Sequence, residues 1–478
     1  MYKYTSPQIS FEDFGQPLGM KMNPGNRWIK KAQYIPWEEI EEKYAKLFAN
    51  EKGNVAKPLR LALGACIIQS EYGYSDEETV LQIQEGPYLQ YFCGLKQYQD
   101  QSPFDPSLMV HFRKRLTPEI LGEINELIIQ KAQKSNSKSK SDDENKNGDD
   151  DNDDLSNRGT MILDATCAPS NIKYPTDTAL LNEAREKSEA LIDQLHQPGK
   201  GEKPRTYRRI ARKKYKKFVR ARKPSQKKIR QCIRQQLGYL GRNLRTIEKM
   251  LENKEPLPNR LARKLEILQI VYQQQKTMYE TKTHKVENRI VSISCPYIRP
   301  IIRGKAKAPV EFGAKLDISV AEGYTRLETF SFDNYNEAKF LEQAIENYHQ
   351  RTGRYPERVL ADKIYRNRDN LRYCAKHHIR LSGPALGRPK KDSQPNKEQE
   401  YLDICQRVEV ERKISLAKRK CGLGCLTTRL AQTTASAIAL SIVVLNLRKI
   451  HRPFFQKLLF PFDFFSDIFS LRFFAFVQ

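Results

Sequence analysis

The stretch Val310-Glu-Phe-Gly-Ala-Lys-Leu-Asp-Ile-Ser-Val320 alternates between apolar and polar side chains along most of its length. Because successive side chains of a β-strand point to opposite faces, this period of two predicts a strand with one buried and one polar face. The dipeptide Glu322-Gly323 then provides a turn, and Tyr324 to Phe332 predicts a second strand. A β-hairpin is therefore expected at this point of the chain.

Further strands and helices are predicted on both sides of this hairpin. Apolar runs that predict strands lie at Thr160–Cys167, Arg358–Asp362 and Ile379–Leu381. Patterns that predict helices lie at Asn336–Arg351, residues 367–377 and residues 401–420. The resulting order of strand, strand, strand, helix, strand, helix, strand, helix is that of the RNase H-like fold. We therefore expect an α+β fold whose mixed sheet has flanking helices, assigned to residues 159–177 and 291–450.

Two helical regions accompany this sheet domain. Residues 1–133 predict an all-helical N-terminal domain, with a helix start at Pro58 and a capping box at Ser75-Asp-Glu-Glu78. Such a domain can bind DNA ends through a helix-turn-helix or serve as a dimerisation scaffold, and both interpretations stay open. Residues 178–290 predict a large basic helical insertion after the first strand.

Two other segments lack the pattern of a folded element. Residues 134–158 are rich in Ser and Lys and then in Asp and Asn, which predicts a disordered acidic linker. This linker is either simply solvated or a mimic of DNA that occupies a basic groove. Residues 451–478 form a Phe-rich C-terminal tail whose role the sequence does not define.

The charge balance favours a polyanionic partner. Lys and Arg number 83 against 57 Asp and Glu, which gives a formal net charge of +26, and nucleic acid is the usual partner of so basic a protein. No signal peptide pattern opens the chain, and the longest apolar stretch, Ala435 to Leu447, is too short to cross a bilayer and predicts a buried helix. We therefore expect a cytoplasmic, nucleoid-associated protein that binds DNA and no membrane.

The predicted insertion carries the densest positive charge, because more than half of the residues from Lys203 to Arg230 are Lys or Arg. Tyr207, Ala211 and Tyr215 recur at helical spacing, so one face of this helix can pack while the rest meets DNA phosphates. A solvated basic face without DNA is the alternative. The residues expected to bind DNA are Arg208, Arg209, Arg212, Lys213, Lys216 and Lys217.

Three acids are candidates for a catalytic site. Asp164 and Asp362 each end an apolar run, where an acid leaves a buried strand at the sheet edge that holds ligands in open α/β sheets. Either acid alone would also suit a simple strand-end cap. Glu411 shares a predicted helix with Arg407 and Lys418, and these positions fall within about 40° of one another around the helix axis. A solvated salt bridge between Arg407 and Glu411 is the alternative.

The segment Arg407-Val-Glu-Val-Glu411-Arg-Lys-Ile-Ser-Leu-Ala-Lys418 resembles the Arg-x3-Glu-x6-Lys signature of DDE transposases from bacterial insertion sequences, most closely the insertion-sequence-five-like group. Asp164 in Leu-Asp-Ala-Thr and Asp362 in Leu-Ala-Asp-Lys-Ile-Tyr resemble the first two catalytic acids of that group. Two features depart from its pattern. Ile404 stands where relatives often have Tyr, and the insertion follows the first strand instead of preceding the helix that bears the Glu.

The resemblance implies a transposase that cuts and joins DNA. Asp164, Asp362 and Glu411 would be the catalytic residues and would hold two Mg²⁺ or Mn²⁺ ions, while Arg407 and Lys418 would contact phosphates. Water would free a 3′-hydroxyl at the element end, and this hydroxyl would then attack target DNA. The implied partners are terminal inverted repeats, target DNA and a second copy in a homodimer. A DNA-binding protein without catalysis and a structure-specific nuclease on the same fold are the alternatives.

Overall fold

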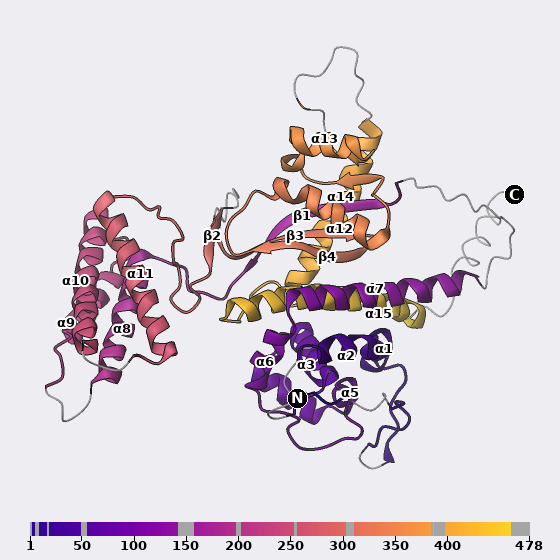
Figure 1. Cartoon of the computed structure of the whole chain (residues 1–478), viewed down its shortest axis with the longest axis horizontal. Coiled ribbons are helices and arrows are strands. Elements are labelled where there is room, and N and C mark those ends of the chain that lie inside the picture. Colours follow the sequence, from indigo (N-terminus) through magenta and orange to yellow (C-terminus); the bar gives the residue numbers. More distant parts are fainter. Residues whose placement is uncertain are drawn as a thin grey trace, which may run out of the picture. The chain divides into compact units, whose positions relative to one another are not determined.

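The computed structural model describes residues 2–4, 9–16, 19–48, 55–141, 157–196, 202–252, 256–302, 310–383, 386 and 397–459 (Figure 1). The chain divides into two compact units. The core unit comprises Met1–Ala168, Lys315–Phe330 and Tyr335–Gln478, and the insertion unit comprises Pro169–Ala314 and Ser331–Asn334. Most of the predicted acidic linker and residues 460–478 of the predicted tail lie outside the described residues.

The core unit is built on a mixed sheet. Its strands are β1 (Thr160–Pro169), β3 (Val310–Ala321), β4 (Tyr324–Ser331), β5 (Arg358–Leu360) and β6 (Arg380–Leu381). β1 lies between β3 and β5, β4 pairs with β3, and the pairs β1–β5 and β5–β6 are parallel. This order is compatible with an RNase H-like fold. The predicted hairpin is confirmed, and its turn residues Glu322 and Gly323 both have positive φ.

Both faces of β3 are buried along most of its length, whereas its alternating pattern predicted that only one face would be. The reason is that neighbouring elements supply polar partners to the second face. Lys315 pairs with Glu337 of the 3-10 turn η2 (Glu337–Phe340). Ser319 donates a hydrogen bond of 2.5 Å to Glu328 of β4, and Glu328 in turn accepts from Asn347 of helix α12 (Leu341–Thr352).

The N-terminal part of the core unit is helical, as predicted. Its helices are α1 (Arg27–Tyr34), α2 (Trp37–Ala45), α3 (Leu59–Tyr72), α4 (Asp76–Glu85), α5 (Pro87–Phe92), α6 (Leu108–Arg115) and α7 (Pro118–Ser141). Pro58 precedes α3, and the Ser75 hydroxyl accepts a hydrogen bond from the Glu78 amide at the start of α4, so both predicted helix starts are confirmed. α7 continues to Ser141, past the boundary at residue 133 that the composition suggested, because the Ser/Lys-rich segment extends the helix.

The C-terminal helix α15 (Ala431–Leu459) packs against α7, α3 and α6. Its apolar stretch from Ala435 to Leu447 is buried, which confirms the prediction of a core helix. Within the described part of the chain, Ala431–His451 is the segment long and apolar enough to span a bilayer, and most of its residues are buried inside the protein. The two ends of the described chain therefore share one hydrophobic core.

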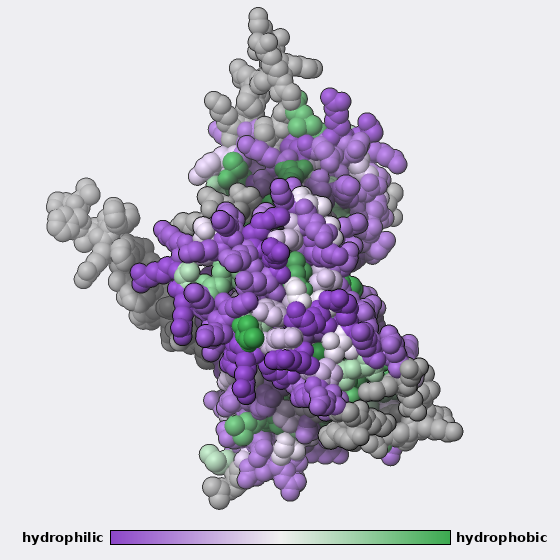
Figure 2. All heavy atoms as spheres, turned by 90° about the vertical axis from the view of Figure 1, so that its left-hand side faces the viewer, coloured by the Kyte–Doolittle hydropathy of each residue, from purple (hydrophilic) through white to green (hydrophobic). Residues whose placement is uncertain are grey.

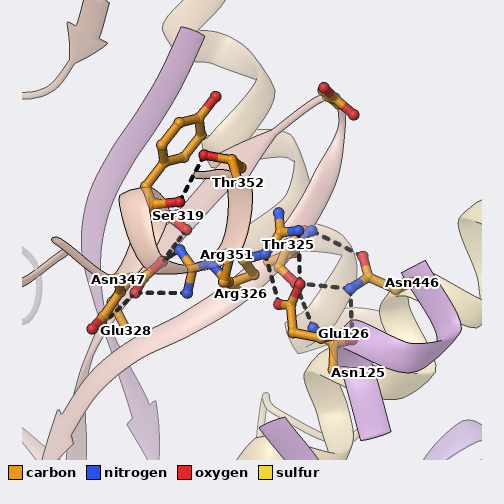
Figure 3. A network of polar contacts seen from close by, with 12 residues as sticks. Asn125, Glu126, Ser319, Thr325, Arg326, Glu328, Asn347, Arg351, Thr352 and Asn446 are labelled. Atoms are coloured by element: carbon orange, nitrogen blue, oxygen red, sulfur yellow. Dashed lines mark hydrogen bonds and ion pairs between the residues drawn. The ribbon is translucent and has the colours of Figure 1, made fainter. Parts of the chain in front are cut away.

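A buried polar network joins these helices to the sheet (Figure 3). The Asn446 amide of α15 donates to the side-chain oxygen of Asn125 in α7 at 2.8 Å and to the Thr325 carbonyl in β4 at 2.7 Å. The Thr325 amide donates back to Asn446 at 2.9 Å. Beside them Arg326 makes two hydrogen bonds to the Glu126 carboxylate, at 2.7 and 3.0 Å. Because buried polar groups are costly unless satisfied, these bonds fix the register of α7 and α15 on β4.

The insertion unit consists mainly of helices. They are α8 (Asp177–Leu195), α9 (Arg208–Val219), α10 (Gln226–Leu251) and α11 (Asn259–Thr281). Apolar side chains of α8, α10 and α11 form its core, and Arg185 is buried among them with hydrogen bonds to Glu189 and Gln236. A short strand that the sequence did not predict, β2 (Arg299–Ile302), pairs antiparallel with the first residues of β3. Its four residues include a proline, which gives no strand signal.

Candidate active site

Asp164 lies on β1 with its side chain directed away from α12. Its neighbours Met161 and Leu163 belong to the core formed with α12 and helix α13 (Arg368–Lys376), so the alternation of the strand directs Asp164 to the opposite face. Burial raises the pKa of the Asp164 carboxyl, and the negative charges of Glu411 and Asp362 raise it further. The hydrogen bond of 2.8 Å from the Ala165 amide and the charge of Arg407 act in the opposite direction.

Asp362 lies two residues after the end of β5. The sequence predicted a strand through this residue, but β5 ends at Leu360 because the Asp362 carboxylate caps the 3-10 turn η3 (Lys363–Tyr365) by accepting from the Lys363 amide at 2.7 Å. Its side chain is 57% exposed, and one oxygen lies 3.9 Å from the guanidinium of Arg407. Asp362 is therefore held at the end of β5, where it faces solvent and one cation.

Glu411 is presented by helix α14 (Lys397–Lys420), which is anchored on the sheet. The buried Asp403 near the start of α14 accepts two hydrogen bonds from Arg380 of β6, at 2.7 and 2.8 Å. Val410 and Ala417 are fully buried beneath the helix, and Glu411 itself is exposed. This anchoring brings Glu411 into electrostatic range of Asp164.

Glu409, the neighbouring acid on α14, has a different surrounding. Its carboxylate lies 3.6 Å from Arg412 and interacts with Lys449 of α15. Glu411, by contrast, is among the groups whose charge raises the pKa of Asp164. The structure therefore brings together Asp164, Asp362, Glu411 and Arg407.

This cluster combines three carboxylates with one guanidinium, so negative charge is in excess. Carboxylate oxygens suit hard divalent cations such as Mg²⁺, and a cation would relieve the repulsion that raises the pKa of Asp164. Among the described residues, however, no group of three or more His, Cys, Asp or Glu side chains is close enough to form a metal site as it stands. The residues fit a divalent cation by chemistry and charge, and their side chains would have to draw together to bind it.

Comparisons with known proteins give matches to the helical N-terminal part of the core unit and to its C-terminal part. Residues 359–448 match a family model described as "Transposase DDE domain", and residues 17–115 match one described as "Transposase domain (DUF772)". These matches support a DDE transposase. A protein of Rhizobium meliloti with the name "Uncharacterized protein ORF8 in nfe locus" is 29% identical over 167 residues, which is 35% of this chain and 73% of that protein. No solved structure matches the chain.

The transposase match covers part of the candidate site. Asp362, Arg407, Glu411 and Lys418 lie within the matched DDE segment, whereas Asp164 precedes it. Lys418 is half-buried and lies in the last turn of α14. The guanidinium of Arg407 lies 3.9 Å from Asp362, and its charge also acts on Asp164.

The six basic residues predicted to bind DNA fall into two groups on α9. Arg209, Arg212, Lys213, Lys216 and Lys217 are exposed. Arg208 instead donates two hydrogen bonds to the Asp193 carboxylate, at 2.7 and 2.9 Å, and this pairing lowers the pKa of Asp193 to about 2. Arg208 therefore joins α9 to α8, and the other five side chains point to solvent.

One buried acid close to the site was missed by the sequence reasoning. Asp317 of β3 is only 1% exposed, and burial raises its pKa to about 7, although the hydroxyls of Tyr335 and Tyr365 favour its charged form. The hydroxyl of Tyr365, at the end of η3, lies 3.4 Å from a carboxylate oxygen of Asp317. The charge of Asp164 contributes to a raised pKa of Tyr365. The pattern placed Asp317 on a polar face that should meet water, and nothing local to it signals that this face is covered.

Proposed function

We propose that this chain is the transposase of a bacterial insertion sequence, in the insertion-sequence-five-like group, and that it cleaves and joins DNA with an RNase H-like catalytic domain. The observation that carries the proposal is that Asp362 and Glu411, which come from two other elements, are close enough to Asp164 for their charges to raise its pKa. Two independent matches to transposase domains support the same activity. The mixed sheet, in which β1 lies between β3 and β5 and β4 pairs with β3, is compatible with this catalytic fold.

In this proposal Asp164, Asp362 and Glu411 would hold two Mg²⁺ or Mn²⁺ ions. When bound, such ions supply the activation of an attacking oxygen and the stabilisation of a leaving oxygen. The protein's own contribution is to hold the three carboxylates at the surface end of the sheet while Asp403 anchors the helix that carries Glu411. Arg407 would keep Asp362 oriented until DNA is bound.

The reaction proposed is cleavage followed by transesterification. Water would displace the 3′-oxygen of the element end from its phosphodiester and leave a 3′-hydroxyl on the element. That hydroxyl would then attack a phosphodiester of target DNA, form the new bond and release the target 3′-hydroxyl. Lys418 would approach a phosphate beside the scissile bond as a point charge. Terminal inverted repeats, target DNA and a second copy of the chain would be the partners, in the cytoplasm at the nucleoid.

The test is a joining assay that separates the proposed transposase from its two rivals. The substrate is a linear fragment that carries the gene with its native flanking DNA, and the target is a supercoiled plasmid in Mg²⁺ or Mn²⁺. A transposase produces covalent joints between fragment ends and plasmid, whereas a nuclease only cuts. A DNA-binding protein without catalysis shifts the fragment in a gel and does neither. Cutting without joints, or binding alone, in both metals contradicts the proposal.

A further inference from the structure

The exposed face of α10 is basic along its whole length. Lys227, Arg234, Arg242, Arg245 and Lys249 are exposed and fall within about 80° of one another around the helix axis. The opposite face is buried through Leu240 and Ile247, among others. Glu248 points outside this basic sector, so the sector carries no acid. Figure 2, which looks toward the insertion unit, shows a mostly hydrophilic face.

The middle of this face forms a shallow depression of about 320 Å³. Its lining residues are Gln231, Arg234, Gln235, Gly238, Tyr239 and Arg242. Space above Gly238 is open, because a side chain there would meet no atom within 4 Å. Glycine inside a helix costs about 1 kcal/mol relative to alanine, so its position at the floor of the depression favours a role in close approach of a partner.

Aromatic rings hold the cations at one end of the depression. The guanidinium of Arg242 lies 4.7 Å from the ring of Tyr207 and 5.8 Å from that of Tyr239. Arg205 lies 5.0 Å from the ring of Tyr207. Tyr207 itself adopts a left-handed backbone conformation with φ of 54°, which is costly for an aromatic residue and is found chiefly where the surroundings require it. These interactions pre-organise the arginines at low entropic cost.

Three side chains of the depression have hydrogen-bonding groups of the kind that bind the edges of base pairs. Gln231, Arg234 and Gln235 make no hydrogen bond or ion pair to the described part of the protein. In the major groove an arginine can bind both acceptors of guanine, and a glutamine can bind adenine through one donor and one acceptor. The major groove admits an α-helix, and the charges of Lys227 and Lys249 toward the two ends of the face suit phosphates.

We propose that the exposed face of α10 lies in the major groove of duplex DNA and reads its sequence through Gln231, Arg234 and Gln235. This inference rests on the proposed function, because it assigns sequence recognition to one surface of a DNA-binding transposase. It also separates two tasks within the insertion unit. α10 selects the sequence, and the exposed cations of α9 bind phosphates of any sequence.

The experiment is selection from a randomised duplex library by the full-length protein, without divalent metal so that no DNA is cut. The wild type and the single variants Arg234→Ala and Gln235→Ala are compared. Because alanine is the best helix former, these substitutions on the outer face keep α10 folded. The matched controls are Arg263→Ala and Gln273→Ala, which remove one exposed arginine and one exposed glutamine side chain from α11.

The expected result is an enriched sequence for the wild type and both controls. Each α10 variant should lose discrimination at one or two base pairs of that sequence by roughly five- to 150-fold. An unchanged enriched sequence in both α10 variants overturns the inference, and so does a uniform loss of affinity, which would indicate that α10 binds phosphates alone. If the wild type binds no duplex at low salt, the proposed function fails as well, so the two failures are distinguishable.

Discussion

At the scale of single residues, the three candidate acids differ in how much the protein constrains them. Asp164 is partly buried, whereas Asp362 and Glu411 are exposed. Burial raises the pKa of Asp164, and on the neighbouring strand β3 it raises the pKa of Asp317 to about 7. Two neighbouring strands of the core unit therefore each carry an acid whose neutral form is favoured by burial.

Asp317→Asn should change how stability depends on pH. The pKa of Asp317 is raised from 3.8 to about 7 in the folded protein, so its stabilising contribution is complete below about pH 4 and is lost as pH rises through 7. Asparagine cannot ionise, so relative to the wild type the variant should gain stability, on the order of 3 kcal/mol, between pH 4 and 8. Urea unfolding at both pH values measures this difference.

The matched control for this prediction is Asp369→Asn, because the Asp369 side chain is 87% exposed on α13. This variant should follow the wild type at both pH values. An Asp317→Asn variant that also follows the wild type would mean that Asp317 ionises as freely in the folded as in the unfolded chain.

At the scale of elements, helix α9 combines an anchor with a basic surface. Arg208 pairs with Asp193 of α8 and holds the first turn of α9 in place. Arg209, Lys213 and Lys216 follow at helical spacing and are exposed. The position of α9 is therefore set by Arg208, and the remaining cations are available to phosphates.

The triple charge reversal Arg209→Glu, Lys213→Glu and Lys216→Glu should weaken binding to every DNA sequence. For each phosphate that the variant no longer neutralises, the slope of log affinity against log salt should become shallower by about 0.9. Titration of a labelled duplex at several salt concentrations measures the slope. Reversal of Arg260, Arg263 and Lys276 on α11 changes the net charge equally and should leave the slope nearly unchanged. Equal weakening in both triple variants would refute a local role of α9 in binding phosphates.

The sequence predicted elements better than it predicted their surroundings. The hairpin of β3 and β4 was predictable because its period of two and its Glu322-Gly323 turn are local signals. The end of β5 was not, because the capping of η3 by Asp362 competes with strand extension. The pairing of Arg208 with Asp193 was equally hidden, since it depends on how two helices pack.

At the scale of the whole chain, residues far apart in sequence build the core unit. Asn446 near the C-terminal end of the described chain bonds Asn125 of α7 and Thr325 of β4. The candidate site is likewise assembled from β1, the end of β5 and α14. The composition indicated a separate N-terminal helical domain, and no local signal could reveal that α15 completes its core. The three acids were chosen as candidates from local signals, because Asp164 and Asp362 each follow an apolar run and Glu411 shares one side of α14 with Arg407 and Lys418.

The central claim is that Glu411 acts with Asp164 and Asp362 in cutting DNA, and its neighbour Glu409 supplies a matched control. The measurement is cleavage, in Mg²⁺, of a supercoiled plasmid that carries the gene with its native flanking DNA. We predict that Glu409→Gln cuts at the wild-type rate, whereas Glu411→Gln binds the same DNA and does not cut it. Cleavage by Glu411→Gln at the wild-type rate would contradict the account.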